Sequence, residues 1–352
     1  MQSVQSVGSP SLWALTIGAV VALLALDFVI TRRPHEVSMR EALGWSAFYI
    51  ALPLAFGGFL WARFGSAQGM EFITGYVVEK SLSVDNLFVF MLLLAAFAVP
   101  AALAQRALLY GIVGALVLRG AFIALGAAAL STLDWAFLLF GAILVVTAIK
   151  IMRDTVTGHG QQVDVSAMRS VRLLRRVMPV TDDYHGPRLL VRQGGRPGGG
   201  PEGQGGGKSI ALTPFALVVA AVLATDVVFA VDSVPAVYGV TGDPFLVFAT
   251  NAFALLGLRA LYFVLQGALA RLVHLGYGLA AILGFIGVKL LLHWAHDSWP
   301  SVPQIPTAAS LAVIAVILAT VTVTSLRATR GGRGMRENEA GTEEPEPSPA
   351  RR

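Results

Sequence analysis

The chain lacks cysteine altogether and carries little charge. None of its 352 residues is cysteine, which excludes disulfides, thiolate metal sites, iron–sulfur ligation and cysteine nucleophiles. Only 13% of the residues are charged, whereas soluble domains average about 25%. With 55% hydrophobic residues and a mean hydropathy of +0.70, this composition excludes a cytosolic enzyme built around one or two cores.

Apolar stretches occupy most of the chain. A helix needs about 20 apolar residues to cross a bilayer, and nine stretches of suitable length are present. They are rich in Leu, Ala, Val and Gly and show no two-residue alternation, which favours helices over a membrane β-barrel. The sequence therefore predicts an all-α, polytopic membrane bundle with nine spans, at residues 12–30, 42–61, 72–99, 107–130, 135–152, 214–237, 245–265, 277–294 and 308–326.

The basic residues predict the orientation of these spans. With the amino terminus outside, 20 of the 26 Lys and Arg residues fall on the cytoplasmic side and only Arg63 falls outside, in agreement with the positive-inside rule. Arg32 and Arg33 follow the first span, which is the reverse of a secretory signal, so we expect this span to remain as an anchor. The basic residues thus report topology, and we expect no nucleic-acid partner.

Two of the spans share a pattern of acidic residues. Glu79 and Asp85 lie six positions apart in the span at 72–99. Asp226 and Asp232 have the same spacing in the span at 214–237. A shared spacing at two distant places indicates an internal repeat.

The spans that follow match as well. The sequence Leu-Val-Leu-Arg ends at Arg119, and Leu-Gly-Leu-Arg ends at Arg259. The third spans of the two groups end in similar apolar runs that close with Lys150 and Lys289. Because three crossings make the second copy enter from the opposite face, we predict two inverted three-helix repeats whose acidic helices meet near the membrane centre.

The repeats and the segments between them divide the chain into six regions. The Gly-rich run at 194–207 cannot bury a core and is expected to be a flexible linker, and the polar tail is expected to be disordered. The regions are two N-terminal helices (1–71), the first repeat (72–152), a basic and Gly-rich cytoplasmic loop (153–212), the second repeat (213–294), the last span (295–326) and the tail (327–352).

Charged side chains inside the spans indicate function. Each costs about 2.5–3.5 kcal/mol at the centre of a membrane helix, so the four acids need compensation. One interpretation is that Lys80, Arg119 and Arg259 neutralise them in ion pairs that only hold the bundle together. The other is that some carboxylates bind a cation, and that the basic residues set its affinity.

The available residue types favour a hard divalent cation. Carboxylate, amide and carbonyl oxygens suit Mg²⁺, Ca²⁺ or Mn²⁺, and the span interiors offer neither Cys nor His. Six residues advance about 9 Å along a helix and turn about 240°, so the two acids of one span cannot chelate one ion together. The candidate ligands are Glu79, Asp85, Asn86, Asp226, Asp232 and Asn251, with Lys80, Arg119 and Arg259 as charge partners.

Ligands from both repeats are therefore needed. We expect Asp85 and Asp232 to form a shared site. Glu79 and Asp226 are then flanking steps or proton acceptors. Asp27, at the end of the first span, is interpreted as an interfacial charge.

The two acidic stretches resemble a known family. The run from Gly75 to Phe90 is similar to the first signature of the TerC family of bacterial membrane proteins, and the run from Thr225 to Ala236 is similar to its second. Asn251 and the stretches at 256–263 and 179–186 resemble the longer, Alx-type branch of the family. The likeness extends over nearly all nine predicted spans.

The resemblance implies a protein of metal homeostasis in the bacterial inner membrane. The family carries a historical tellurium-resistance label, and similar members export Mn²⁺ from the cytoplasm. Its acidic residues match Glu79, Asp85, Asp226 and Asp232, whereas Leu223 stands where many relatives carry a glutamate. A cysteine-free chain offers no reducing group for tellurite.

These observations predict a transporter that exports a hard divalent ion, Mn²⁺ first, in exchange for protons. We expect no enzyme activity, no catalytic residue and no permanently bound cofactor. The alternative is a scaffold or metal sensor that does not transport and that docks cytoplasmic proteins through residues 153–212. A membrane hydrolase is disfavoured, because the spans contain no Ser–His or His–Glu–x–x–His arrangement.

Overall fold

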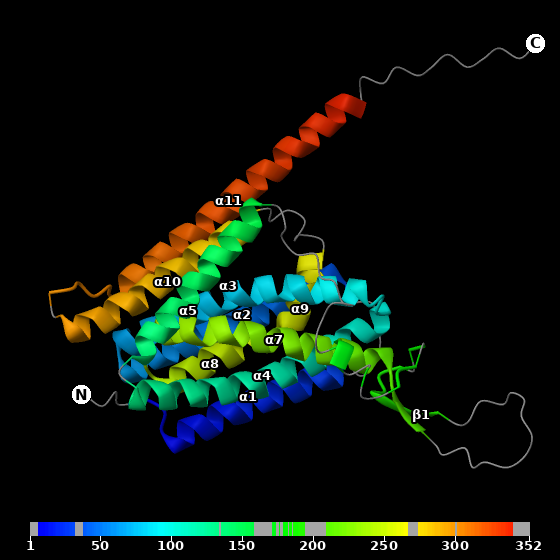
Figure 1. Cartoon of the computed structure of the whole chain (residues 1–352), viewed down its shortest axis with the longest axis horizontal. Helices are drawn as coiled ribbons and strands as arrows, with labels where there is room; N and C mark the ends of the chain where they lie inside the picture. Colours follow the sequence, from blue (N-terminus) through cyan, green and yellow to red (C-terminus); the bar gives the residue numbers. More distant parts are fainter. Residues whose placement is uncertain are drawn as a thin grey trace, which may run out of the picture.

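The molecule is a bundle of long helices with a small two-stranded sheet at one end (Figure 1). The computed structural model describes residues 6–31, 38–133, 135–157, 209–266, 274–299 and 301–340, and between 171 and 193 it describes 171–173, 176, 179–181, 183–184 and 186–193. The elements are α1 (Pro10–Thr31), α2 (Met39–Phe64), α3 (Ser66–Ala96), α4 (Ala101–Thr132), α5 (Ala136–Val156), β1 (Leu190–Gln193), β2 (Ser209–Leu212), α7 (Pro214–Tyr238), α8 (Pro244–Leu255), α9 (Leu258–Gln266), α10 (Leu275–Ser298) and α11 (Thr307–Ala340).

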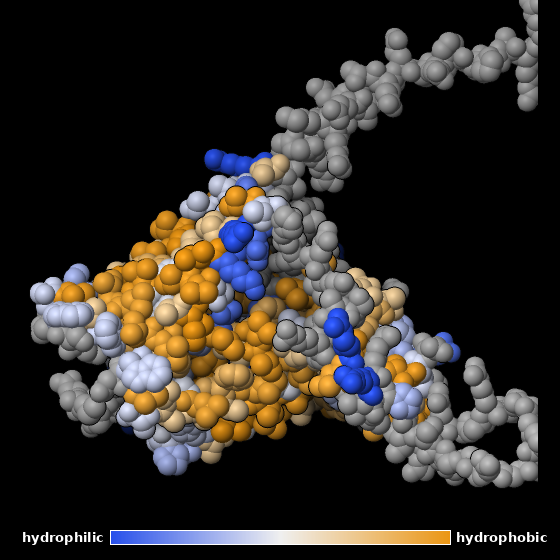
Figure 2. Space-filling model, in the orientation of Figure 1, coloured by the Kyte–Doolittle hydropathy of each residue, from blue (hydrophilic) through white to orange (hydrophobic). Residues whose placement is uncertain are grey.

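The predicted class, an all-α polytopic membrane protein, is confirmed. Seven of the described helices are long and apolar enough to span a membrane, and the bent pair α8–α9 makes up to eight. Hydrophobic side chains cover much of the coloured part of the face seen in Figure 2. Every stretch of α3 long enough for a span holds at least three of Glu71, Glu79, Lys80 and Asp85, so this helix does not qualify by composition. The count of nine therefore stays a prediction.

The helices of the two predicted repeats pack against their counterparts. Helix α3 contacts α7, α4 contacts α8 and α9, and α5 contacts α10. The α5–α10 pair is antiparallel, since Gly141 approaches Gly287 while Thr155 approaches Gly276. A Cβ on either Gly141 or Gly287 would lie 3.0 Å from the carbonyl oxygen of the other, so small residues set this close contact. An inverted repeat would produce this packing, and the repeat itself stays a prediction.

The prediction of one continuous helix at 245–265 was wrong. Asp243 caps the start of α8 by accepting from Phe245 N (2.9 Å), and Pro244 follows at the first helical position. The helix ends at Leu255, and α9 leaves at an angle of 41°. Gly257 has φ +78°, a conformation that glycine adopts at no steric cost, and this residue separates the two helices.

The loop at 153–212 and the tail contain regular structure that the sequence did not predict. Strands β1 and β2 pair antiparallel, with Leu190 opposite Leu212, so the base of the loop is ordered. The predicted flexible linker at 194–207 lies outside the described residues. Residues 327–340, predicted as the start of a disordered tail, continue α11 as helix.

Candidate functional site between the repeats

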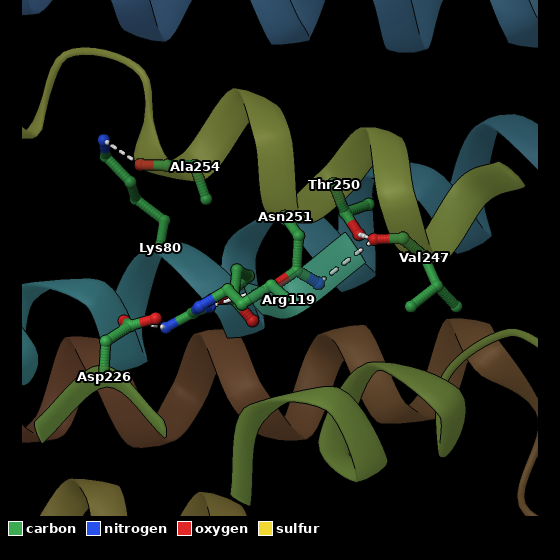
Figure 3. A network of polar contacts seen from close by, with 8 residues as sticks. Lys80, Arg119, Asp226, Val247, Thr250, Asn251 and Ala254 are labelled. Atoms are coloured by element: carbon green, nitrogen blue, oxygen red, sulfur yellow. Dashed lines mark hydrogen bonds and ion pairs between the residues drawn. The ribbon is translucent and has the colours of Figure 1, made fainter. Parts of the chain in front are cut away.

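One arginine joins four helices near the centre of the bundle. Arg119 extends from α4, and its side chain is 1% exposed. Its Nη1 donates to the carboxylate of Glu79 on α3 and to Asn251 Oδ1 on α8 (2.9 Å). Its Nη2 donates to Asp226 Oδ1 on α7 (3.3 Å). In Figure 3 the guanidinium of Arg119 lies between Asp226 and Asn251.

The partners of Arg119 are as buried as the arginine itself. Glu79 is 0% exposed, and Asp226 and Asn251 are each 1% exposed. Asn251 Nδ2 donates to Val247 O (3.1 Å), which leaves its Oδ1 directed at Arg119. The amide of Asn86 on α3 satisfies its contacts when its oxygen accepts from Arg119 Nη2 (3.1 Å). The planar fork of the guanidinium suits such simultaneous recognition of several oxygens.

Several oxygens of this cluster are left without a partner. Among the described residues, nothing donates a hydrogen bond to Glu79 Oε2 or Asp226 Oδ2. The buried hydroxyls of Ser83 and Ser233, on the same two helices, also lack one. Two ionised carboxylates and one guanidinium would carry a net charge of −1, which is costly without water. The cluster can therefore accept one proton or a cation.

The cluster brings together the two acids that were expected to flank the site. Glu79 and Asp226, predicted as flanking groups, share Arg119. Asp232 lies at another place, where it accepts from Thr147 Oγ1 on α5 (2.8 Å). Asp85 belongs to α3, but its side chain lies outside the described part of the chain, so its predicted pairing with Asp232 stays a prediction. No group of three or more His, Asp or Glu side chains with the arrangement of a metal site occurs among the described residues.

Among the residues that the structure describes, one of the three expected charge partners, Arg119, contacts these acids. Arg259 on α9 instead donates to Asp27 on α1, through Nε at 3.0 and 3.1 Å and through Nη2 at 2.5 Å. Lys80 donates to the backbone carbonyl of Ala254 (3.1 Å). Asp27, interpreted from the sequence as an interfacial charge, is 5% exposed and forms this ion pair, so it is not a solvent-exposed charge. Its position inside an apolar span was the signal that could have identified it.

Comparisons with known proteins agree with this description. The Integral membrane protein TerC family matches residues 64–333. The chain is 40% identical over 293 residues to STKORF319, an uncharacterized membrane protein of Myxococcus xanthus, covering 83% of this chain and 86% of the relative. It is 39% identical over 297 residues to Alx of Escherichia coli K12, whose name provisionally describes a membrane-bound redox modulator, covering 82% and 87%. No solved structure gives a significant match.

Proposed function

The chain belongs to the integral membrane protein TerC family, and we propose on that premise that it exports a hard divalent cation, Mn²⁺ first, across the bacterial inner membrane in exchange for protons. No ion is held permanently. The amino terminus faces outward and the carboxyl terminus faces the cytoplasm, as the basic residues predict.

The observation that carries the proposal is the cluster around Arg119. Carboxylates from the counterpart helices α3 and α7 converge on one buried guanidinium. One oxygen of each carboxylate accepts no hydrogen bond from the described residues. Arg119 thus holds in place the oxygens that a divalent ion would need. Withdrawal of its guanidinium would leave Glu79, Asp226 and Asn251 as hard oxygen ligands.

Charge balance supports an exchange with protons. A divalent ion that replaces the guanidinium between two carboxylates gives a neutral site. The empty site, with the guanidinium back between Glu79 and Asp226, is neutral when one of the two carboxyl groups is protonated. Release of the ion and uptake of a proton therefore go together. Asp85 and Asp232 serve in this scheme as steps toward and away from the cluster.

Leu223 bears on the number of protons exchanged. The resemblance to the family implies a glutamate at this position in many relatives, and here Leu223 packs against Gly114 of α4. Gly114 lies five residues before Arg119 on the same helix. The wall of the site therefore has an apolar contact at this position, and we propose that this chain exchanges fewer protons per ion than relatives with the glutamate.

The packing supports a rocking motion about the site. The contacts of α3 with α7, α4 with α8, and α5 with α10 are those that two inverted halves make across a shared axis. The Arg119 cluster lies where α3, α4, α7 and α8 meet. A relative movement of the halves would separate Glu79 from Asp226 and open the cluster to one side.

Flux measurements test the proposal. The purified chain is reconstituted into liposomes, and uptake of Mn²⁺, Mg²⁺, Ca²⁺, Zn²⁺ and Fe²⁺ is followed with and without a pH gradient. We expect Mn²⁺ flux that a pH gradient drives. Glu79→Gln and Asp226→Asn should each reduce it at least about tenfold, whereas Asp154→Asn, which makes the same chemical change at the end of α5, should not. Absence of flux for every ion, or full flux in both cluster variants, would contradict the proposal.

A second candidate is a scaffold or metal sensor acting through residues 153–212. The ordered β1–β2 pair at the base of this loop favours it over an unstructured linker. Deletion of residues 194–207 separates the candidates. A transporter keeps its flux in liposomes after the deletion, whereas a scaffold shows no flux before it and loses its cellular phenotype after it.

A further inference from the structure

The carboxyl end of α8 presents carbonyl oxygens inside the bundle. Leu256 N still donates to Ala252 O (3.1 Å), and the next helical bond after the break runs from Leu261 N to Gly257 O (2.9 Å). Within the described residues, no backbone N–H donates to the carbonyls of Phe253 and Leu256. The carboxyl end of a helix also carries a partial charge of about −0.5 elementary charge. The break in α8–α9 therefore creates a place that attracts a cation.

A lysine side chain fills this place. Lys80 reaches across from α3, and its Nζ donates to Ala254 O in the last turn of α8 (3.1 Å) (Figure 3). No ion pair of Lys80 with a carboxylate is found in the described part of the chain. The neighbouring acid on α3, Glu79, is bound to Arg119 instead. The ammonium is thus balanced by carbonyl oxygens and the helix end.

The other cation at the break is already neutralised. Arg259 lies in the first turn of α9, and both its Nε and Nη2 donate to Asp27. It is paired with Asp27 on the first helix of the chain and, within the described part of the chain, forms no hydrogen bond with α8. Among the residues that the structure describes, Lys80 is therefore the positive charge that contacts the end of α8.

We propose that the carboxyl end of α8 is a binding site for one monovalent cation and that the Lys80 ammonium occupies it. Carbonyl oxygens at the ends of broken membrane helices coordinate such ions, and an ammonium group offers the same single charge. Removal of the lysine charge should open the site to Na⁺ or K⁺ from solution. The wild-type protein should need neither ion.

Thermal unfolding of the full chain in detergent tests this site without any transport assay. Wild type and Lys80→Met, which keeps an unbranched side chain without the charge, are compared in NaCl, KCl and choline chloride at equal ionic strength. Wild type should have the same Tm in all three salts. In choline chloride, Lys80→Met should have a lower Tm than wild type. Its Tm should be higher in NaCl or KCl than in choline chloride by on the order of 2 °C, at a cation concentration about ten times Kd.

Two further measurements test the proposed cation site at the end of α8. Lys80→Arg retains the charge and should show no response to Na⁺ or K⁺. If Lys80→Met is too unstable to melt, its monodisperse fraction on size-exclusion chromatography is compared in the three salts. Recovery in NaCl or KCl alone supports the site. An equal Tm in all salts, or aggregation in all of them, overturns it, whether or not the chain exports Mn²⁺.

Discussion

Arg119 and Arg259 end similar four-residue motifs in the two predicted repeats, yet their surroundings differ. Arg119 lies in the continuous helix α4 and contacts Glu79, Asp226 and Asn251 on three other helices. Arg259 lies just after the break and pairs with Asp27 alone among the described carboxylates. The first arginine joins the two halves, whereas the second fastens one half to α1, which belongs to neither.

One residue of the motif explains much of this difference. Val117 of Leu-Val-Leu-Arg lies in α4 with 69% of its surface exposed. Its counterpart Gly257 has φ +78°, and the space of a Cβ there is taken by Tyr49 of α2. The glycine lets the chain turn, which places Arg259 away from the centre. A repeat in sequence thus yields one central arginine and one peripheral arginine.

The largest loss of stability is expected when Arg119 is replaced. Arg119→Met leaves two buried carboxylates without their cation and should lower the free energy of unfolding by at least about 3–5 kcal/mol. The measurement is thermal unfolding in detergent. The triple variant Arg119→Met, Glu79→Gln, Asp226→Asn should recover most of the loss but not the Mn²⁺ flux. An unchanged Tm in Arg119→Met would remove the central role assigned to this residue.

Arg259→Met should have the next largest effect on stability, about 3 kcal/mol, since it removes the buried guanidinium that donates to Asp27 through Nε and Nη2. The double variant Arg259→Met, Asp27→Asn should be more stable than the single variant and should keep its Mn²⁺ flux, in contrast to the neutralised Arg119 cluster. Unfolding and liposome flux are measured on the same preparations. Loss of flux in a stable double variant would show that the two arginines do not differ as described.

Exchange of the motif residues tests the role of the break. Gly257→Val places a branched side chain at positive φ and against Tyr49, and should cost about 2–3 kcal/mol of stability. Val117→Gly, in a regular helix, should cost less than about 1 kcal/mol. Equal losses in the two variants, measured by unfolding in detergent, would contradict the account of the turn at Gly257.

Among the polar contacts, the smallest effect on stability is expected at the separate acid, Asp232. Thr147→Val removes the hydrogen bond to Asp232 and should cost about 1 kcal/mol. Asp232→Asn, in contrast, should make cells accumulate Mn²⁺ and become sensitive to it, as should Asp85→Asn. Metal content of the cells and growth in Mn²⁺ provide the measurement, with Asp154→Asn as control. Wild-type behaviour of both variants would exclude these acids from the path.

The fold was predictable from local chemistry, and the site only in part. Apolar runs predicted the helices, because a membrane leaves few other ways to satisfy the backbone. The repeated spacing identified Glu79 and Asp226 as residues of interest. It did not identify their shared partner, because segment boundaries read from sequence leave the depth of each charge uncertain. The ion pair of Asp27 with Arg259 was not predicted for the same reason, since the two residues lie 232 positions apart along the chain.

The amino-acid sequence by itself determined that this is a helical membrane protein with acidic residues repeated in two halves. Hydropathy and spacing act locally along the chain, so they can be read without coordinates. The tertiary structure alone decided which charge meets which: Arg119 between Glu79 and Asp226, and Lys80 at the end of α8. Such pairings depend on the depth and rotation of each helix, which packing between neighbours sets.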